Sequence, residues 1–230
     1  MKNIAIIGSG SWGAALGIYL ATHGHSVKMW SFDEDEKNLI NNKRKCVFLP
    51  KARIPEGVVC SSSFEEVLDG ADIILHVTPS KFVRSTIKQY KEFVKPNQIL
   101  LMCSKGFEAE TEYTLDQVME EELPEIKTGI LSGPSHAEEV SIGVPTLLVV
   151  ASKHEDVREI VSEEFKSNTL RLYTSDDVKG VELGGALKNI IAFCAGIAVG
   201  LELGDNTFAA LATRGLVEID RLRNCNGWTK

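Results

Sequence analysis

Short apolar runs alternate with segments of helical apolar spacing over the first 175 residues. The runs predict buried strands at 3–7, 26–30, 58–60, 71–77, 98–102, 128–131, 145–151 and 169–173. Helices are expected between them at 14–22, 64–68, 81–93 and 153–166. This alternation predicts an α/β fold built on a parallel, doubly wound sheet.

The pattern becomes all-helical after about Ser175. One helix is expected to start near residues 175–177 and to contain a long apolar run, and another is expected from Asn206 or Thr207 to about residue 223. A domain boundary is the simplest account of the change. We therefore predict two domains, 1–175 and 176–230.

The apolar run from Leu183 to Leu201 approaches the length of a membrane span. Lys188 and Asn189 interrupt it, glycines are spread along it, and acidic residues lie near its ends where basic anchors are expected. We therefore predict a core helix. Burying the unpaired ammonium of Lys188 costs several kcal/mol, so that residue needs a reason, and proton transfer is one.

Composition narrows the class of protein. With 43% hydrophobic and 25% charged residues among 230, the chain is expected to be globular. Its formal net charge of -7 argues against a nucleic-acid partner, because no basic patch would answer a phosphate backbone. A phosphate group of a small ligand would therefore have to be recognised by a few residues at one site.

The cysteines and histidines show no metal-ligand spacing. Five cysteines, an odd number, fit a reducing cytoplasm, and no targeting segment precedes the first strand. We interpret the cysteines as packing residues and expect no metal. They are Cys46, Cys60, Cys103, Cys194 and Cys225.

A glycine-rich turn, Gly8-Ser9-Gly10-Ser11-Trp12-Gly13, links the first strand to the first helix. Gly8 permits a tight turn, Gly10 lets a pyrophosphate approach the backbone, and Gly13 lets the helix pack closely on the strand. An ordinary glycine-rich turn is the alternative, but the strand, helix and second strand complete a unit of about 30 residues, as dinucleotide binding requires. The sequence therefore predicts a dinucleotide site.

The end of the second strand discriminates NAD from NADP in such folds. It reads Trp30-Ser31-Phe32, without arginine, and the acidic residues 33–36 follow. These acids would repel a ribose phosphate if they lie near it, although they also suit the solvated first turn of a helix. The pattern favours NAD.

Two further polar turns follow buried strands, at 78–80 and 104–106, where ligands of doubly wound sheets gather. Lys105 lies in the second turn, and a solvated loop is its alternative explanation. Phe82 could contact the nicotinamide side of the site or belong to the core. Ser132 or Ser135 could cap a helix that begins near residue 136 and offers backbone amides to an anion.

Taken together, these motifs resemble those of the cytoplasmic NAD(P)-dependent glycerol-3-phosphate dehydrogenases. The resemblance extends to about Leu222, and the residues from 223 to 230 do not look like the family. Its further motifs are Val77-Thr78-Pro79-Ser80, Ser104-Lys105-Gly106, Gly133-Pro134-Ser135, Glu182 to Ala192, and Gly204-Asp205-Asn206-Thr207 through Ala212-Thr213-Arg214-Gly215-Leu216.

The resemblance implies a Rossmann-like sheet followed by an all-α domain of the 6-phosphogluconate-dehydrogenase type, here incomplete. It implies hydride transfer between NAD(P) and C2 of dihydroxyacetone phosphate or sn-glycerol 3-phosphate, which feeds glycerophospholipid synthesis. A small phosphorylated substrate would be the partner, without nucleic acid or a membrane span, and a homodimer is left open.

The resemblance also implies roles for individual residues. Lys188 matches the proton donor and acceptor. Phe32 matches an aromatic position of NAD-dependent members, which again favours NAD over NADP. The other cofactor contacts are Gly8, Gly10, Ser11, Trp12, Gly13, Phe82, Lys105 and Ala137; the substrate contacts are Lys105, Gly133, Ser135, Lys188 and Asn189.

The sequence departs from the family in two places. Phe208 replaces a lysine, and the later motifs that carry the aspartate partner of the catalytic lysine and the phosphate-binding arginine have no counterpart. A catalytically impaired NAD-binding fragment, acting as a sensor or interaction module, is therefore the alternative to an active enzyme. A 3-hydroxyacid or 6-phosphogluconate-type dehydrogenase is a third, but residues 133–135 and 188–189 favour glycerol 3-phosphate.

Overall fold

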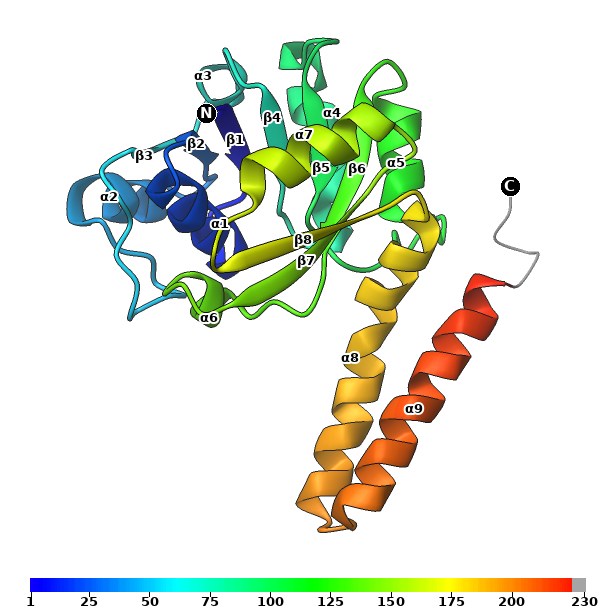
Figure 1. Cartoon of the computed structure of the whole chain (residues 1–230). Helices are drawn as coiled ribbons and strands as arrows, with labels where there is room; N and C mark the ends of the chain where they lie inside the picture. The colour runs from blue at the N-terminus through cyan, green and yellow to red at the C-terminus, as the bar shows by residue number, and fades with distance from the viewer. Residues whose placement is uncertain (225–230) are drawn as a thin grey trace.

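The computed structural model describes residues 1–224, so Cys225 and the rest of the tail lie outside the described residues. An eight-stranded sheet crosses the molecule (Figure 1). Its spatial order is β3 (Val58–Ser61), β2 (Ser26–Trp30), β1 (Asn3–Ile7), β4 (Ile73–His76), β5 (Ile99–Met102), β6 (Lys127–Ser132), β7 (Thr146–Ala151) and β8 (Leu170–Ser175).

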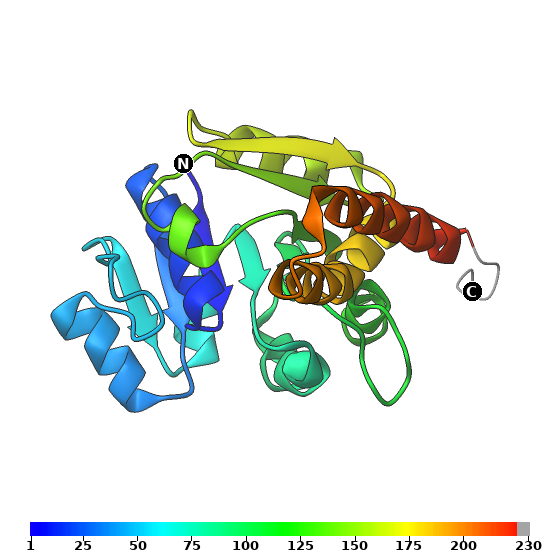
Figure 2. The ribbon, with the colours of Figure 1, turned by 90° about the horizontal axis from the view of Figure 1, so that it is seen from below.

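Helices cover both faces of this sheet, and two longer helices extend away from it (Figures 1 and 2). Short 3-10 turns at Ser80–Phe82 and Lys91–Phe93 flank α4. The helices are α1 (Ser11–Thr22), α2 (Glu34–Lys43), α3 (Phe64–Leu68), α4 (Val83–Tyr90), α5 (Leu115–Glu122), α6 (Ala137–Val140), α7 (Glu155–Phe165), α8 (Val178–Gly200) and α9 (Gly204–Arg223).

The sheet separates two apolar cores. Ile4 and Ile6 of β1 pack in one core with α1, α6 and α7, whereas Ala5 and Ile7 pack in the other with α3, α4 and α5. Successive strand residues point to opposite faces, so a strand covered on both sides needs apolar residues at every position. This is why the first strand reads as a continuous apolar run.

The first six strands confirm the predicted doubly wound arrangement, because every pairing among them is parallel. The strand order reverses between β1 and β4, which creates a crevice at their carboxyl ends.

The expectation of a wholly parallel sheet is wrong for β7, which pairs antiparallel with β6. The connection from β6 carries α6 along the carboxyl edge, where it packs against α1. The next strand therefore starts at that edge and runs back across the sheet. β8 pairs parallel with β7.

Two local details also differ from the sequence expectations. Helix α5 was not predicted, although Thr114 and Gln117 form a capping box at its start. Neither Ser132 nor Ser135 caps α6, since His136 occupies the N-cap position and makes no side-chain cap bond.

The prediction that the long apolar helix lies in a core is wrong for most of α8. After Gly185, only Ala198 is buried among its residues, and no residue of α9 is buried. The two helices pack on each other, and Gly215 of α9 fits closely against Ile191 of α8. Within residues 1–224, α8 alone is long and apolar enough to cross a membrane, judged by length and composition.

Candidate functional site

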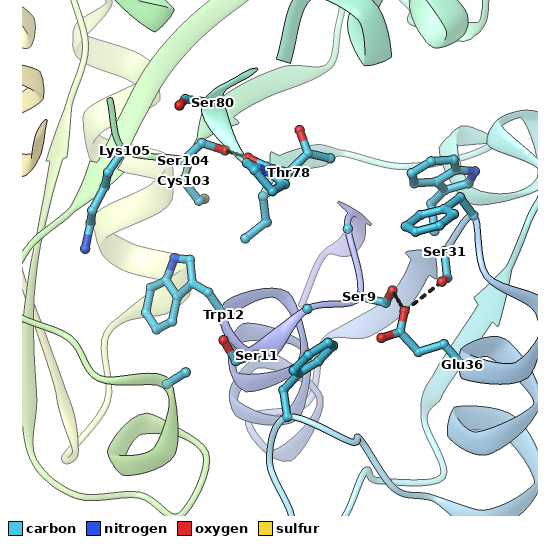
Figure 3. Close-up of a pocket in the computed structure, with 18 of the residues that line it drawn as sticks. Ser9, Ser11, Trp12, Ser31, Glu36, Thr78, Ser80, Cys103, Ser104 and Lys105 are labelled. Atoms are coloured by element: carbon cyan, nitrogen blue, oxygen red, sulfur yellow. Dashed lines mark hydrogen bonds between the residues drawn. The ribbon is translucent and has the colours of Figure 1, made fainter. Parts of the chain in front are cut away.

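A cavity of about 700 Å³ opens at the carboxyl edge of the sheet, where the strand order reverses. Loops that follow β1, β2, β4 and β5 form its walls, and the start of α6 closes one side (Figure 3). Its lining residues are Gly8, Ser9, Gly10, Ser11, Trp12, Trp30, Ser31, Phe32, Asp33, Glu36, Phe48, Val77, Thr78, Pro79, Ser80, Cys103, Ser104, Lys105, Ser135, His136, Ala137 and Glu138.

The glycine loop has the geometry that its sequence predicts. Gly8 adopts a φ of 124°, which favours glycine. A Cβ at Gly13 would lie 2.0 Å from the carbonyl oxygen of Gly8, so only glycine lets α1 approach the strand this closely. A Cβ at Gly10 would meet nothing within 4 Å, which leaves its backbone open to the cavity.

The N-terminus of α1 is available to an anion. Gly10 is its N-cap, no side chain caps the helix, and its first turn contains no acidic residue. The unpaired amides and the helix dipole therefore present positive potential to the cavity.

Trp12 adds a specific sign that a polar ligand fits here. Its Nε1 is buried without a hydrogen-bond partner among the described residues. Figure 3 shows the indole pointing into the cavity on the same side as Lys105. Buried N–H donors are normally paired, so a ligand acceptor at this position would satisfy the indole. The open loop and this donor fit a dinucleotide.

The end of β2 forms the opposite side of the cavity. Phe32 is 80% exposed, and Asp33 caps α2 by accepting from the amides of Asp35 and Glu36. The carboxylate of Glu36 accepts hydrogen bonds from Ser31 Oγ at 2.9 Å and from Ser9 Oγ (Figure 3). One acidic side chain therefore connects α2 to the glycine loop.

Lys105 lines the other end of the cavity, and the charge of Lys188 on α8 acts on it. Lys105 Nζ donates to the carbonyl oxygen of Gly133 at 3.3 Å, and its stem packs beside Gly185 of α8. Burial lowers the pKa of Lys105, and the charge of Lys188 lowers it further. A cation at the cavity wall with a second cation acting on it favours an anionic ligand.

The other predicted substrate residues lie around this pair. Ser135 lines the cavity, and Gly133 has a φ of 148° with its backbone against Leu147 and Leu148. Lys188 is half-buried and Asn189 is exposed. Lys105 and Ser135 thus line the cavity, whereas Gly133, Lys188 and Asn189 do not. Gly133 is linked to Lys105 by a hydrogen bond, and Lys188 acts on Lys105 through its charge.

Most of the predicted cofactor residues line the cavity, and two do not. Gly13 lies behind the loop, where it sets the packing of α1. Phe82 is 48% exposed outside the lining, with Lys81 Nζ 4.7 Å from its ring centroid. The remaining predicted residues, Gly8, Gly10, Ser11, Trp12, Phe32, Lys105 and Ala137, all face the cavity.

The hydrogen-bond network that holds Thr78 in place was not predicted from the sequence. His76 is fully buried, and its two ring nitrogens contact Tyr90 Oη at 2.9 Å and Thr78 Oγ1 at 2.7 Å. Burial lowers the pKa of His76 to about 3, so the ring stays neutral. A histidine inside an apolar strand is the signal that could have indicated this network. Phe48, His136 and Glu138 also line the cavity and carry no comparable signal.

No metal centre accompanies the cavity in the described part of the chain, where no three His, Cys, Asp or Glu side chains are arranged to hold an ion. Cys46, Cys60 and Cys103 are buried and free, which agrees with a packing role, and Cys194 is partly exposed.

Comparisons with known proteins agree with this geometry. Residues 3–158 match the family model for the NAD-dependent glycerol-3-phosphate dehydrogenase N-terminus, and residues 177–228 match the model for its C-terminus. The second match contains α8, so this apolar helix is part of a domain that the family shares. A 3-hydroxyacid or 6-phosphogluconate-type dehydrogenase is therefore set aside.

Individual relatives carry the same description. Glycerol-3-phosphate dehydrogenases [NAD(P)+] of Fusobacterium nucleatum and Bacillus mycoides are 45% and 46% identical to the chain; each match covers 96% of it, and 67% and 66% of those relatives. The chain thus spans about two thirds of their length.

Solved structures give the same result. A glycerol-3-phosphate dehydrogenase from Coxiella burnetii matches with a TM-score of 0.90 at 35% identity, covering 96% of this chain and 68% of that one. The Saccharomyces cerevisiae enzyme matches with a TM-score of 0.84 at 29% identity, covering 96% and 69%. The chain belongs to the NAD-dependent glycerol-3-phosphate dehydrogenase family.

Proposed function

We propose that this chain interconverts dihydroxyacetone phosphate and sn-glycerol 3-phosphate with a nicotinamide dinucleotide. The observation that carries the proposal is Lys105, which lines the dinucleotide cavity, donates to the Gly133 carbonyl oxygen and has its pKa lowered by burial and by the charge of Lys188. The family and its NAD(P)-dependent relatives support it. Residues 1–175 would form the cofactor domain, and residues from 176 onward would begin the substrate domain.

The chain's own residues would divide the binding task. The amides at the start of α1 hold the pyrophosphate, and Trp12 Nε1 donates to a cofactor acceptor. Lys105, fixed by the Gly133 carbonyl oxygen, attracts the substrate's negative charge. When bound, the nicotinamide supplies or accepts the hydride.

Lys188 would act as the proton donor in one direction and the proton acceptor in the other. In the reducing direction its ammonium polarises the substrate ketone and gives a proton to the oxygen on C2 as the alkoxide forms. In the oxidising direction its amine accepts that proton from the C2 hydroxyl.

The test is NADH oxidation with dihydroxyacetone phosphate by the chain and by two lysine variants. Lys188→Ala is expected to lower kcat by about 10²–10⁴-fold, the usual contribution of a positioned acid or base. Lys81→Ala removes an exposed cation outside the cavity lining and is the matched control. Full activity of Lys188→Ala would contradict the proton-transfer role.

The second candidate function is an NAD-binding module that has lost catalysis. The exposed apolar surface of α8 and α9 favours it, because a substrate domain with uncovered apolar faces is not self-sufficient. Tight NADH binding without turnover in the same assay would support this module over the enzyme.

We also propose a cytoplasmic location for the chain. Free, buried thiols at Cys46, Cys60 and Cys103 suit a reducing compartment. A homodimer stays a prediction.

A further inference from the structure

We propose that Glu36 selects NAD over NADP, an inference that rests on the cofactor part of the proposed function. Its carboxylate would accept from the adenosine ribose hydroxyls of NAD and would repel the 2′-phosphate of NADP. The relatives are described only as using NAD(P)+, so the choice between the two cofactors must come from this chain's own residues.

The carboxylate of Glu36 is held in place from two sides. Ser31 Oγ, at the end of β2, donates to its Oε2 at 2.9 Å, and Ser9 Oγ, inside the glycine loop, donates to the same oxygen. Asp33 fixes the first turn of α2 by accepting from the amide of Glu36 at 3.1 Å. The side chain is half-buried and lines the cavity, so it is preorganised rather than free in solvent.

This position corresponds to the ribose end of a dinucleotide. The pyrophosphate is expected at Gly10 and the start of α1, and Ser9 lies one residue before that point. Trp12 and Lys105 define the opposite, nicotinamide end of the cavity (Figure 3). The adenosine ribose therefore falls beside β2 and α2, where an acidic side chain recognises ribose hydroxyls.

The charges around Glu36 offer nothing to a 2′-phosphate. Asp33 lines the same end of the cavity. The nearby cations are engaged elsewhere, since Lys37 pairs with Glu34 and Arg44 pairs with Glu56 at 2.9 Å. Within the described cavity wall, the basic side chains are those of Lys105 and His136, which belong to other elements.

Phe32 is not suited to select between NAD and NADP. That side chain is 80% exposed and carries no charge or polar group, so it cannot distinguish a hydroxyl from a phosphate by hydrogen bonding. Its ring does not stack on that of Trp30, since the two rings are tilted by 44° with centroids 6.4 Å apart. Glu36 offers the chemistry that Phe32 lacks.

The test is equilibrium titration of the whole chain with NADH and with NADPH, followed by calorimetry. Wild type is expected to bind NADH at least about tenfold more tightly than NADPH, because like charges in an interface are strongly unfavourable. Glu36→Gln keeps the size and an acceptor oxygen but removes the charge, so the ratio of the two dissociation constants is expected to fall by about tenfold.

Glu34→Gln is the matched control, because Glu34 lies on the same helical turn, pairs with Lys37 and is absent from the described cavity lining. It should leave the ratio unchanged. Ser31→Ala should lower the ratio by a smaller factor, since it frees the carboxylate without removing it. Equal affinities in wild type, or an unchanged ratio in Glu36→Gln, would overturn the proposal.

Binding measurements separate this inference from the reaction itself. Lys188→Ala should lose turnover but keep the wild-type preference for NADH. Selective NADH binding by a chain that never turns over would sink the proposed reaction and leave the role of Glu36 standing. Failure to bind either nucleotide would overturn both.

Discussion

The sheet region (residues 1–175) and the helix pair (α8 and α9) differ in how far their apolar side chains are buried. In residues 1–175 the strands are covered on both faces, and side chains such as Ile6 and Ile74 are fully buried. In α8 and α9 the large apolar side chains of Phe193 and Leu216 are 70% and 67% exposed. The two regions have similar kinds of residues but only the first closes a core around them.

This difference assigns separate tasks to the two regions. The described residues that line the cofactor cavity all belong to the sheet region, whose two apolar cores support the loops. The helix pair contributes Lys188 and Asn189 through the first half of α8, which touches the sheet region at Val178, Leu183 and Gly185. Cofactor binding should therefore depend on the first region alone, and turnover on both.

The largest effect is expected when a glycine in each region is changed to alanine, in two separate variants. Gly13→Ala would place a Cβ 2.0 Å from the Gly8 carbonyl oxygen, so α1 must move away from β1. We expect NADH affinity to fall by about 100-fold or more, because the loop that receives the pyrophosphate is displaced. Gly184→Ala meets nothing within 4 Å. It should leave binding intact and stabilise α8 by about 0.5–1 kcal/mol.

Calorimetric titration and thermal unfolding measure both outcomes. Normal NADH binding by Gly13→Ala would refute the close-approach role of that glycine.

Truncation of a large apolar side chain should be costly only in the sheet region. Ile74→Ala removes a fully buried side chain between β1 and β5, and we expect a loss of about 2–5 kcal/mol in the free energy of unfolding. Phe193→Ala trims an exposed side chain and should change it by no more than about 0.5 kcal/mol. Urea unfolding gives both values. Similar losses would mean that the α8 face is covered in solution.

A further prediction concerns the pH dependence of stability at the joint between the regions, where α8 packs against α5. Glu182 of α8 is buried, and its carboxylate accepts from the Asp116 amide at 3.0 Å at the start of α5. Burial, with a contribution from the Asp116 charge, raises the pKa of Glu182 to about 8 from 4.5. Burial also raises the pKa of Asp116, although Lys153 opposes that shift.

A raised carboxyl pKa means that the folded state binds more protons than the unfolded state. The free energy of unfolding contributed by Glu182 should therefore fall as the pH rises from about 4.5 to about 8. Between pH 6 and pH 9, the Tm of wild type should drop by about 5–10 °C more than that of Glu182→Gln.

Glu218→Gln, at a partly exposed carboxylate on α9, is the matched control and should behave like wild type. Equal drops in wild type and Glu182→Gln would exclude a buried carboxylate at the joint.

Local signals in the sequence predicted much of the fold. Spacing and residue type alone predict the glycine loop and strands β1 to β6. They also predict that α8 starts near its N-cap, Asp177. The direction of β7 could not be predicted, because it depends on where α6 docks. Helix α5 was missed even though its capping box is visible at Thr114 and Gln117.

The candidate site was predictable to the extent that its residues follow strands. Lys105 and the glycine loop stand directly after β5 and β1, so topology alone brings them to one edge. The meaning of Glu36 was not predictable, because a surface acid in a first helical turn and an acid facing the cavity have the same sequence pattern. The exposure of α8 was also hidden, since an apolar run does not reveal which neighbours cover it.

Hydrogen–deuterium exchange with and without NADH tests most directly whether the cofactor site belongs to the sheet region alone. Added protection is expected at residues 8–13, 31–36 and 77–80, which line or adjoin the cavity, with no change across α9. Protection of α9 equal to that of the glycine loop, or no protection of the loop, would contradict this division of the molecule.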